Sequence, residues 1–223
     1  MSARVELDLA RTSVFLDFDG TISTTDVGVR LLERFGAEGW RAIDEEYERG
    51  LVGSRVCLLD EWDLLHADEA RLRSVASEVP IDPDFVPLVD DLTRAGAEVA
   101  IVSDGFGFYV HDTCSRLGVD VAVYTNAVDW ETGRLEFPHE DRCCPCTSCG
   151  VCKQAPIKDA ARRGRTTVLV GDGTSDRKAA LLADALFAKG ALARWCAAGG
   201  VPFVAFDRLA DVRAALIGER RIA

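Results

Sequence analysis

The sequence contains no apolar run long enough to cross a membrane and no surplus of positive charge. A membrane-spanning helix needs about 20 consecutive, mostly apolar residues, and no stretch of the 223-residue chain approaches that length. The 26 Lys and Arg residues are outnumbered by 37 Asp and Glu residues, so the formal net charge is -11. This balance argues against a nucleic-acid backbone or an anionic membrane as the main partner.

Features of an exported protein are also missing. Residues 1–11 alternate charged and apolar side chains and lack the apolar centre and the small-residue cleavage site of a signal peptide. We therefore expect a cytoplasmic protein, in which the eight cysteines favour metal binding or free thiols over disulfides. Internal repeats and low-complexity tracts are absent, and 48% hydrophobic with 28% charged residues is ordinary for a globular enzyme.

The chain is organised around residues 14–21, which read VFLDFDGT. An apolar, β-favouring run that ends in two acids and a Gly-Thr turn indicates a buried parallel strand, with Asp17 and Asp19 at its carboxyl end. Because alternate residues of an extended segment point the same way, these two carboxylates can converge. Close carboxylates suit a divalent cation, or a nucleophile and a proton donor; an ordinary Asp-Gly turn is the alternative.

The rest of the chain predicts an α/β fold. Helical patterns separate the apolar runs, and this rhythm implies a parallel sheet with right-handed crossovers. After the first strand, the predicted strands are residues 98–102, 119–124, 166–170, 185–188 and 201–206, and the predicted helices between and after them are residues 83–94, 108–117, 154–163, 176–183, 192–198 and a last helix to residue 217. Two short β-prone runs around Gly133 predict a small hairpin.

Residues 24–82 break this rhythm, because they contain helical patterns with no strand between them. The four predicted helices are residues 27–35, 40–49, 54–65 and 68–79. We therefore expect a Rossmann-like three-layer core, formed by residues 1–23 and 83–223, with an inserted helical cap at residues 24–82.

Four motifs in order along the chain resemble those of the haloacid dehalogenase superfamily. DFDGT at residues 17–21 resembles the first, IVSDG at 101–105 the second, Lys153 after Cys152 the third, and LVGDGTSD at 169–176 the fourth. Together with the helical cap, they make the chain similar to the phosphoserine-phosphatase-like group. Within that group, SDGFGFY at residues 103–109 and CGVCK at 149–153 are most similar to the phosphatases of methionine salvage.

The resemblance implies a phosphatase that works through an aspartyl-phosphate. Asp17 would be the nucleophile, and Asp19 would protonate the leaving oxygen and then activate water. Dehalogenases of this fold lack the second acid, so Asp19 favours phosphate ester hydrolysis. Mg²⁺ would be held by Asp17, the backbone carbonyl of Asp19 and Asp172, with Asp176 ordering the ligand shell.

The second motif implies a phosphate site. A hydroxyl there, with neighbouring backbone N–H groups, would bind phosphoryl oxygens, which points to Ser103 with Asp104 and Gly105; Thr21 adds a hydroxyl from the first loop. Capping of the following helix is a second role open to Ser103.

The third-motif lysine has two candidates. Lys153 stands at a junction between loop and helix, where it can face the sheet edge, and the resemblance also selects it. Lys158 is typical of a solvated helix lysine.

Cys143, Cys146, Cys149 and Cys152 form three successive C-x-x-C steps. This density favours a tetrahedral structural Zn²⁺ site, which would fix the backbone just before Lys153. Free or redox-active thiols and an iron–sulfur cluster stay open as alternatives, and His139 is a further candidate ligand.

We therefore expect a Mg²⁺-dependent phosphomonoesterase, a monomer or homodimer, acting on a small phosphorylated metabolite such as the enol phosphate of methionine salvage. Hydrolysis of phosphoserine, phosphoethanolamine or a specialised-pathway sugar phosphate, and transfer of phosphate to an alcohol, are the alternatives within the resemblance. A non-catalytic, zinc-bearing interaction module is the alternative from another class.

Overall fold

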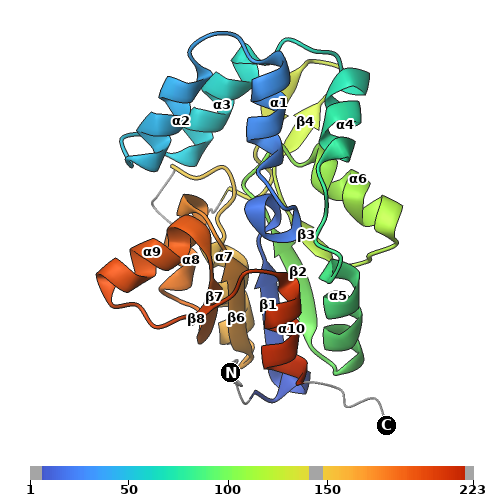
Figure 1. Cartoon of the computed structure of the whole chain (residues 1–223), viewed down its shortest axis with the longest axis vertical. Coiled ribbons are helices and arrows are strands. Elements are labelled where there is room, and N and C mark those ends of the chain that lie inside the picture. Colours follow the sequence, from blue (N-terminus) through green and yellow to red (C-terminus); the bar gives the residue numbers. More distant parts are fainter. Residues whose placement is uncertain (1–6, 141–147, 219–223) are drawn as a thin grey trace.

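The computed structural model describes residues 7–140 and 148–218, and a six-stranded parallel sheet forms its centre (Figure 1). The strand order is β3-β2-β1-β6-β7-β8. A short 3-10 turn, Leu9–Arg11, leads into β1. The strands are β1 (Thr12–Leu16), β2 (Glu98–Val102), β3 (Ala122–Tyr124), β6 (Thr166–Gly171), β7 (Ala185–Ala188) and β8 (Val204–Ala205). β1 lies between β2 and β6, so it is fully paired and completely buried.

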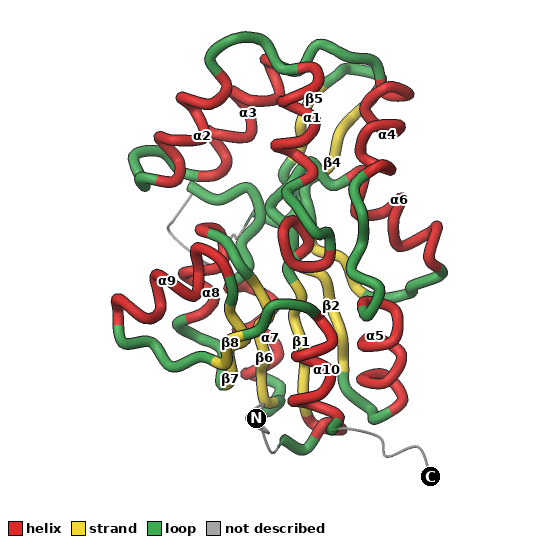
Figure 2. Tube along the Cα trace, in the orientation of Figure 1, coloured by secondary structure: helices red, strands yellow, loops and turns green. Residues whose placement is uncertain are grey.

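Helices cover both faces of this sheet (Figure 2). Val14 and Leu16 of β1 point to one face, and they share a core with α5 (Phe85–Arg94) and α10 (Leu209–Ile217). Phe15 points to the other face, where the covering helices are α7 (Gln154–Arg162), α8 (Arg177–Ala180) and α9 (Gly190–Gly199). Each fully buried apolar side chain contributes roughly 1.5–3 kcal/mol, so these two layers fix the register of the sheet.

Four helices stand beyond the carboxyl ends of the strands and form the cap segment (Figure 1). They are α1 (Val27–Phe35), α2 (Trp40–Glu48), α3 (Ser54–Leu64) and α4 (Glu69–Glu78). Two of them begin at aspartate caps: the carboxylates of Asp26 and Asp68 each accept a hydrogen bond of 2.9 Å from the backbone N–H three residues later.

The cap segment leaves the core and returns to it at one place. Ser23 and Ile81 form an antiparallel bridge, flanked by hydrogen bonds of 2.9 Å from Thr24 N to Pro80 O and from Asp82 N to the carbonyl of Ile22. Two short, paired linkers therefore connect the segment to the core, close to the predicted boundaries. The division into two domains stays a prediction.

The expected hairpin is present as β4 (Ala127–Asp129) and β5 (Arg134–Glu136), which pair antiparallel. It contacts the cap segment through Trp62, whose indole donates a 2.9 Å hydrogen bond to the carbonyl of Gly133. The ring of Trp62 also packs against Phe106 and Trp130, and Trp130 packs against Phe108 at the start of α6 (Phe108–Leu117).

The α/β architecture is confirmed, and the differences lie at the sheet edges. The predicted strands at residues 119–124 and 201–206 shorten to β3 and β8, because each is an edge strand with a partner on one side only. The predicted helix at residues 176–183 is a 3-10 turn, Thr174–Asp176, followed by the short α8. No helix in the described ranges is both long and apolar enough to span a bilayer.

Candidate active site

Three central strands deliver polar side chains to one edge of the sheet. Asp17 follows β1 directly, Ser103 follows β2, and Asp172 follows β6. Because these strands are adjacent and parallel, their carboxyl ends meet. The structure thus brings the first, second and fourth predicted motifs together.

The loop after β1, Phe18–Ile22, turns sharply and is closed by a 2.9 Å hydrogen bond from Ser23 N to Phe18 O. Gly20 adopts a φ of 71°, and a Cβ there would stand 2.4 Å from an oxygen of Asp172. Thr21 donates a 2.8 Å hydrogen bond to Asp172 Oδ1. Glycine at position 20 therefore suits both the left-handed turn of this loop and its close approach to Asp172.

Lys153 is buried between two carboxylates. Its Nζ lies 2.7 Å from Asp17 Oδ1 and 2.8 Å from Asp176 Oδ1, and the residue is only 3% exposed. Burial by itself would lower the pKa of Lys153, but Asp17 and Asp176 raise it above its ordinary value. The third-motif lysine is thus a fixed cation, whereas Lys158 is exposed.

The two carboxylate oxygens of Asp17 differ in their contacts with the protein. Oδ1 contacts Lys153 and also accepts a 2.8 Å hydrogen bond from Phe18 N. Among the described residues, none donates a hydrogen bond to Oδ2. Burial and then the neighbouring Asp176 raise the pKa of Asp17, while Lys153 opposes them. Asp17 Oδ2 is therefore the oxygen without a donor from the described protein, and the role of Asp17 as nucleophile stays a prediction.

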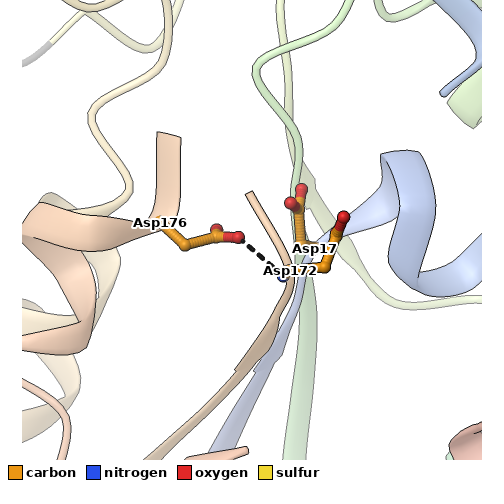
Figure 3. Close-up of side chains that lie close together, drawn as sticks. All are labelled: Asp17, Asp172 and Asp176. Atoms are coloured by element: carbon orange, nitrogen blue, oxygen red, sulfur yellow. Dashed lines mark hydrogen bonds between the residues drawn. The ribbon is translucent and has the colours of Figure 1, made fainter. Parts of the chain in front are cut away.

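Carboxylate oxygens of Asp17, Asp172 and Asp176 lie within 4.8 Å of one another (Figure 3). Backbone N–H groups of Asp172 and Gly173 hold Asp176 Oδ2 at 3.1 and 3.2 Å. Burial and the charge of Asp176 raise the pKa of Asp172 to about 6, although the hydrogen bond from Thr21 acts to lower it. Three hard oxygen donors that repel one another fit a divalent cation such as Mg²⁺.

Asp19 occupies a different environment from Asp17. Val27 N donates a 2.9 Å hydrogen bond to Asp19 Oδ1, and the hydroxyl of Tyr109 donates one of 2.9 Å to Oδ2. Ser103 Oγ lies 3.5 Å from the same Oδ2. Burial, with a contribution from Asp26, raises the pKa of Asp19 to about 8. The surroundings of Asp19 therefore favour its protonated form more than those of an exposed carboxyl group do, and its role as general acid stays a prediction.

The second-motif loop is held by part-buried hydrogen bonds. Ser103 Oγ accepts a 3.2 Å hydrogen bond from Gly105 N. Asp104 Oδ1 accepts one of 2.8 Å from Val151 N, and Asn126 Nδ2 donates one of 2.8 Å to the carbonyl of Gly105. Asp104 thus ties this loop to the segment that carries Lys153. The phosphate-binding roles of Thr21, Asp104 and Gly105 stay predictions.

Two site residues had no assigned role in the sequence. Asn126 lies two residues after the end of β3, and its place near a strand's carboxyl end was the available signal. Tyr109 lies within the matched run at residues 103–109, but the run does not indicate that its hydroxyl reaches Asp19.

Half of the predicted zinc site lies outside the described residues, namely Cys143 and Cys146. Cys149 is half-buried, with Sγ 3.5 Å from Lys178 Nζ, and Cys152 is buried directly before Lys153. The zinc site stays a prediction.

A cavity of about 490 Å³ lies between these motif loops and the cap segment. Its floor includes Asp17, Asp19 and Asp172, and Asp44 and Glu61 are among its residues from the cap segment. This size suits a small-molecule ligand.

A model of the haloacid dehalogenase-like hydrolase family matches residues 14–181. A 2-hydroxy-3-keto-5-methylthiopentenyl-1-phosphate phosphatase from Exiguobacterium sp. is 28% identical over 211 residues, covering 93% of this chain and 98% of the relative. The phosphatase of the same name from Exiguobacterium sibiricum is 27% identical over 208 residues, covering 89% and 93%.

The fold is also similar to a solved phosphoserine phosphatase, described as a phospho-aspartyl intermediate analogue. The TM-score is 0.71 at 19% identity, over 92% of this chain and 98% of that one. The chain therefore belongs to the haloacid dehalogenase-like hydrolase family, as its four motifs predict, and is an enzyme of the phosphoric monoester hydrolase class.

Proposed function

We propose that the protein is a Mg²⁺-dependent phosphomonoesterase that hydrolyses a small phosphorylated metabolite through a phosphoryl group on Asp17. One observation carries this proposal: Asp17 lines the cavity and contacts the buried cation Lys153 through Oδ1, while Oδ2 receives no hydrogen bond from the described residues. A carboxylate held this way can attack an anionic phosphate with less repulsion.

In the first half-reaction, Asp17 Oδ2 attacks phosphorus. A P–O bond to Asp17 forms, and the bond from phosphorus to the ester oxygen breaks with its electron pair on that oxygen. Asp19 gives its proton to the ester oxygen, and the alcohol leaves. The raised pKa of Asp19, about 8, supports this role as acid.

In the second half-reaction, the Asp19 carboxylate takes a proton from water. The water oxygen attacks phosphorus, the P–O bond to Asp17 breaks, and inorganic phosphate leaves with Asp17 restored. The hydrogen bonds from Val27 N and the Tyr109 hydroxyl stabilise the charged form of Asp19 that this step requires.

Asp17, Asp172 and the carbonyl of Asp19 are the groups that would hold Mg²⁺, with Asp176 ordering their surroundings. Bound Mg²⁺ supplies positive charge that offsets the repulsion between a carboxylate nucleophile and a phosphate dianion. Lys153 adds a second positive charge, and the Ser103 hydroxyl with the N–H groups of its loop would position the phosphoryl oxygens.

The cap segment would act as a second domain that covers the substrate. Its paired linkers at Ser23 and Ile81 would let the four helices move together, and its inward residues would contact the leaving group. Exclusion of water during phosphoryl transfer would follow from such closure.

The curated relatives name one candidate substrate, 2-hydroxy-3-keto-5-methylthiopentenyl-1-phosphate. This compound belongs in any substrate panel for the chain, together with phosphoserine, phosphoethanolamine and sugar phosphates. An added alcohol in the same assay separates hydrolysis from phosphate transfer, because transfer would yield a new phosphate ester.

The test is phosphate release from this panel and from p-nitrophenyl phosphate, with Mg²⁺ or with EDTA. We expect release with Mg²⁺, loss of release with EDTA, and loss in Asp17→Asn. Lys158→Ala is the matched control for Lys153→Ala, and only the latter should be inactive. Release from Asp17→Asn at the wild-type rate would overturn the proposed mechanism.

The structural zinc expected at the four cysteines has a separate test. Metal analysis of the purified protein should find one Zn²⁺ per chain, and Cys149→Ser should lose it. Absence of zinc from the wild-type protein would favour the thiol alternative.

A further inference from the structure

The first turn of α3 is a place where the cap segment contacts the core directly. Arg55 N donates a 3.1 Å hydrogen bond to the carbonyl of Ser148. Gly53 approaches the same carbonyl so closely that a Cβ at position 53 would stand 2.1 Å from its oxygen. Ser54, between these two residues, is only 7% exposed. The start of α3 is therefore docked on the segment that leads to Lys153.

The hydroxyl of Ser54 joins two separate parts of the core. Ser54 Oγ accepts a buried hydrogen bond of 3.2 Å from Gly150 N. The same hydroxyl donates a hydrogen bond to the carboxylate of Asp104, in the second-motif loop. Because buried polar groups lose stability when they lack a partner, one side chain of the cap segment helps to hold both core segments in place.

Asp104 extends this link to the residues of the site. Its Oδ1 accepts a 2.8 Å hydrogen bond from Val151 N, two residues before Lys153. Lys153 in turn contacts Asp17 at 2.7 Å. Asp104 also follows Ser103 directly in the chain. A continuous series of hydrogen bonds and chain neighbours therefore runs from the cap segment to the groups that would receive the phosphate.

From these contacts we propose that Ser54 is a positioning residue, whose hydroxyl holds Asp104 and residues 150–151 and thereby sets Lys153 and the second-motif loop. The inference rests on the proposed function, because it takes the phosphoryl group to be transferred to Asp17. Docking of the cap segment would then complete the phosphate site, in addition to covering the substrate.

The first test is the Ser54→Ala variant, assayed with p-nitrophenyl phosphate and with the best ester of the substrate panel. We expect kcat to fall about tenfold or more for both esters, by the same factor, with little change in KM. Ser77→Ala is the matched control, because Ser77 is an exposed serine of the cap segment that bonds within α4, and it should keep wild-type kinetics. A loss confined to one ester would overturn the inference, since it would mean that Ser54 contacts the leaving group.

A double-mutant cycle separates positioning through Asp104 from general damage to the fold. If the hydroxyl acts through Asp104, Ser54→Ala should lose most of its effect on kcat in an Asp104→Asn background. The same factor in both backgrounds would overturn the inference.

Hydrogen exchange at the backbone amide of Val151 tests the link without a substrate. This amide bonds to Asp104 and not to Ser54, so its exchange should be faster in Ser54→Ala than in wild type or Ser77→Ala. Unchanged exchange would overturn the inference. Wild-type cleavage together with a fully active Ser54→Ala variant makes only the inference fail. If the wild-type protein cleaves no ester, the proposed function fails, and exchange at Val151 still decides whether Ser54 holds this segment.

Discussion

At the scale of single residues, the site depends on giving two neighbouring aspartates different surroundings. Asp17 contacts the cation Lys153, whereas Asp19 receives hydrogen bonds from a backbone N–H and from the Tyr109 hydroxyl. The first arrangement suits a charged nucleophile, and the second suits a group that changes protonation during the reaction. Two roles would therefore follow from two residues that are only two positions apart.

Tyr109 should act as a positioning residue for Asp19. In Tyr109→Phe the 2.9 Å hydrogen bond to Asp19 Oδ2 is lost while the ring stays packed against Phe18 and Phe108. Hydrogen bonds to charged groups contribute about 1.5–3 kcal/mol, so kcat should fall about tenfold or more with little change in KM. Steady-state kinetics on one ester measure this. A raised KM with unchanged kcat would contradict the assignment, and Tyr124→Phe outside the cavity is the control.

The sequence predicted the residues that follow strands, because a strand's carboxyl end can be identified from local pattern. Asp17, Ser103 and Asp172 belong to this class. Lys153 does not follow a strand, and it was predicted from its motif instead. Tyr109 and Ser54 could not be assigned roles from sequence, since their contacts join separate elements. No local pattern indicates that a tyrosine on α6 reaches Asp19, or that a serine on α3 reaches Asp104.

At the scale of elements, the cap segment is joined to the rest by its linkers and by helices that pack into the larger apolar core. Its two linkers pair at Ser23 and Ile81, and Trp62 is the main aromatic contact to the hairpin. Periodicity predicted the helices of this segment well, whereas their packing on the hairpin depends on Trp62 and Trp130, far apart in sequence. The hairpin thus supports the cap segment from the side.

Two substitutions of Trp62 should weaken the packing of the cap segment on the hairpin to different extents. Trp62→Phe removes the hydrogen bond to Gly133 O and should lower the free energy of unfolding by about 1 kcal/mol. Trp62→Ala also removes the ring contacts with Phe106 and Trp130, and should cost about 3 kcal/mol. Chemical denaturation gives both values. Equal stability of the two variants would mean that the ring contacts contribute nothing.

At the scale of the whole molecule, an acidic chain concentrates carboxyl groups around one cavity. Burial raises the pKa of several of them, including Asp17, Asp19, Asp172 and Glu61. The folded protein therefore binds protons that the unfolded chain releases. Stability should be greatest in mildly acidic solution and should decline as these groups ionise.

The pH dependence of stability can be tested separately at Glu61. Burial, then the charges of Asp44 and Asp26, raise its pKa from 4.5 to about 8. Glu61 stabilises the fold fully at a pH below the pKa that it has in the unfolded chain. This contribution, at most about 5 kcal/mol, is lost as the pH rises through about 8.

The free energy of unfolding of Glu61→Gln, relative to wild type, should therefore increase between about pH 5 and pH 9. Urea denaturation at a series of pH values measures the difference, with Asp60→Asn, at an exposed acid on the same helix, as the control. Parallel pH curves for wild type and Glu61→Gln would refute the shifted pKa.

The most direct measurement of the central claim is the detection of a phosphoryl group on Asp17. The Asp19→Asn variant is mixed with p-nitrophenyl phosphate and Mg²⁺, quenched in acid, and examined by peptide mass spectrometry. This ester has a leaving group that departs without a proton, so the first half-reaction continues while hydrolysis of the intermediate is slowed. We expect the peptide that contains Asp17 to carry one phosphoryl group, and the Asp17→Asn/Asp19→Asn double variant to carry none. A released phenol with no phosphoryl group on Asp17, or with one on another residue, would contradict the mechanism.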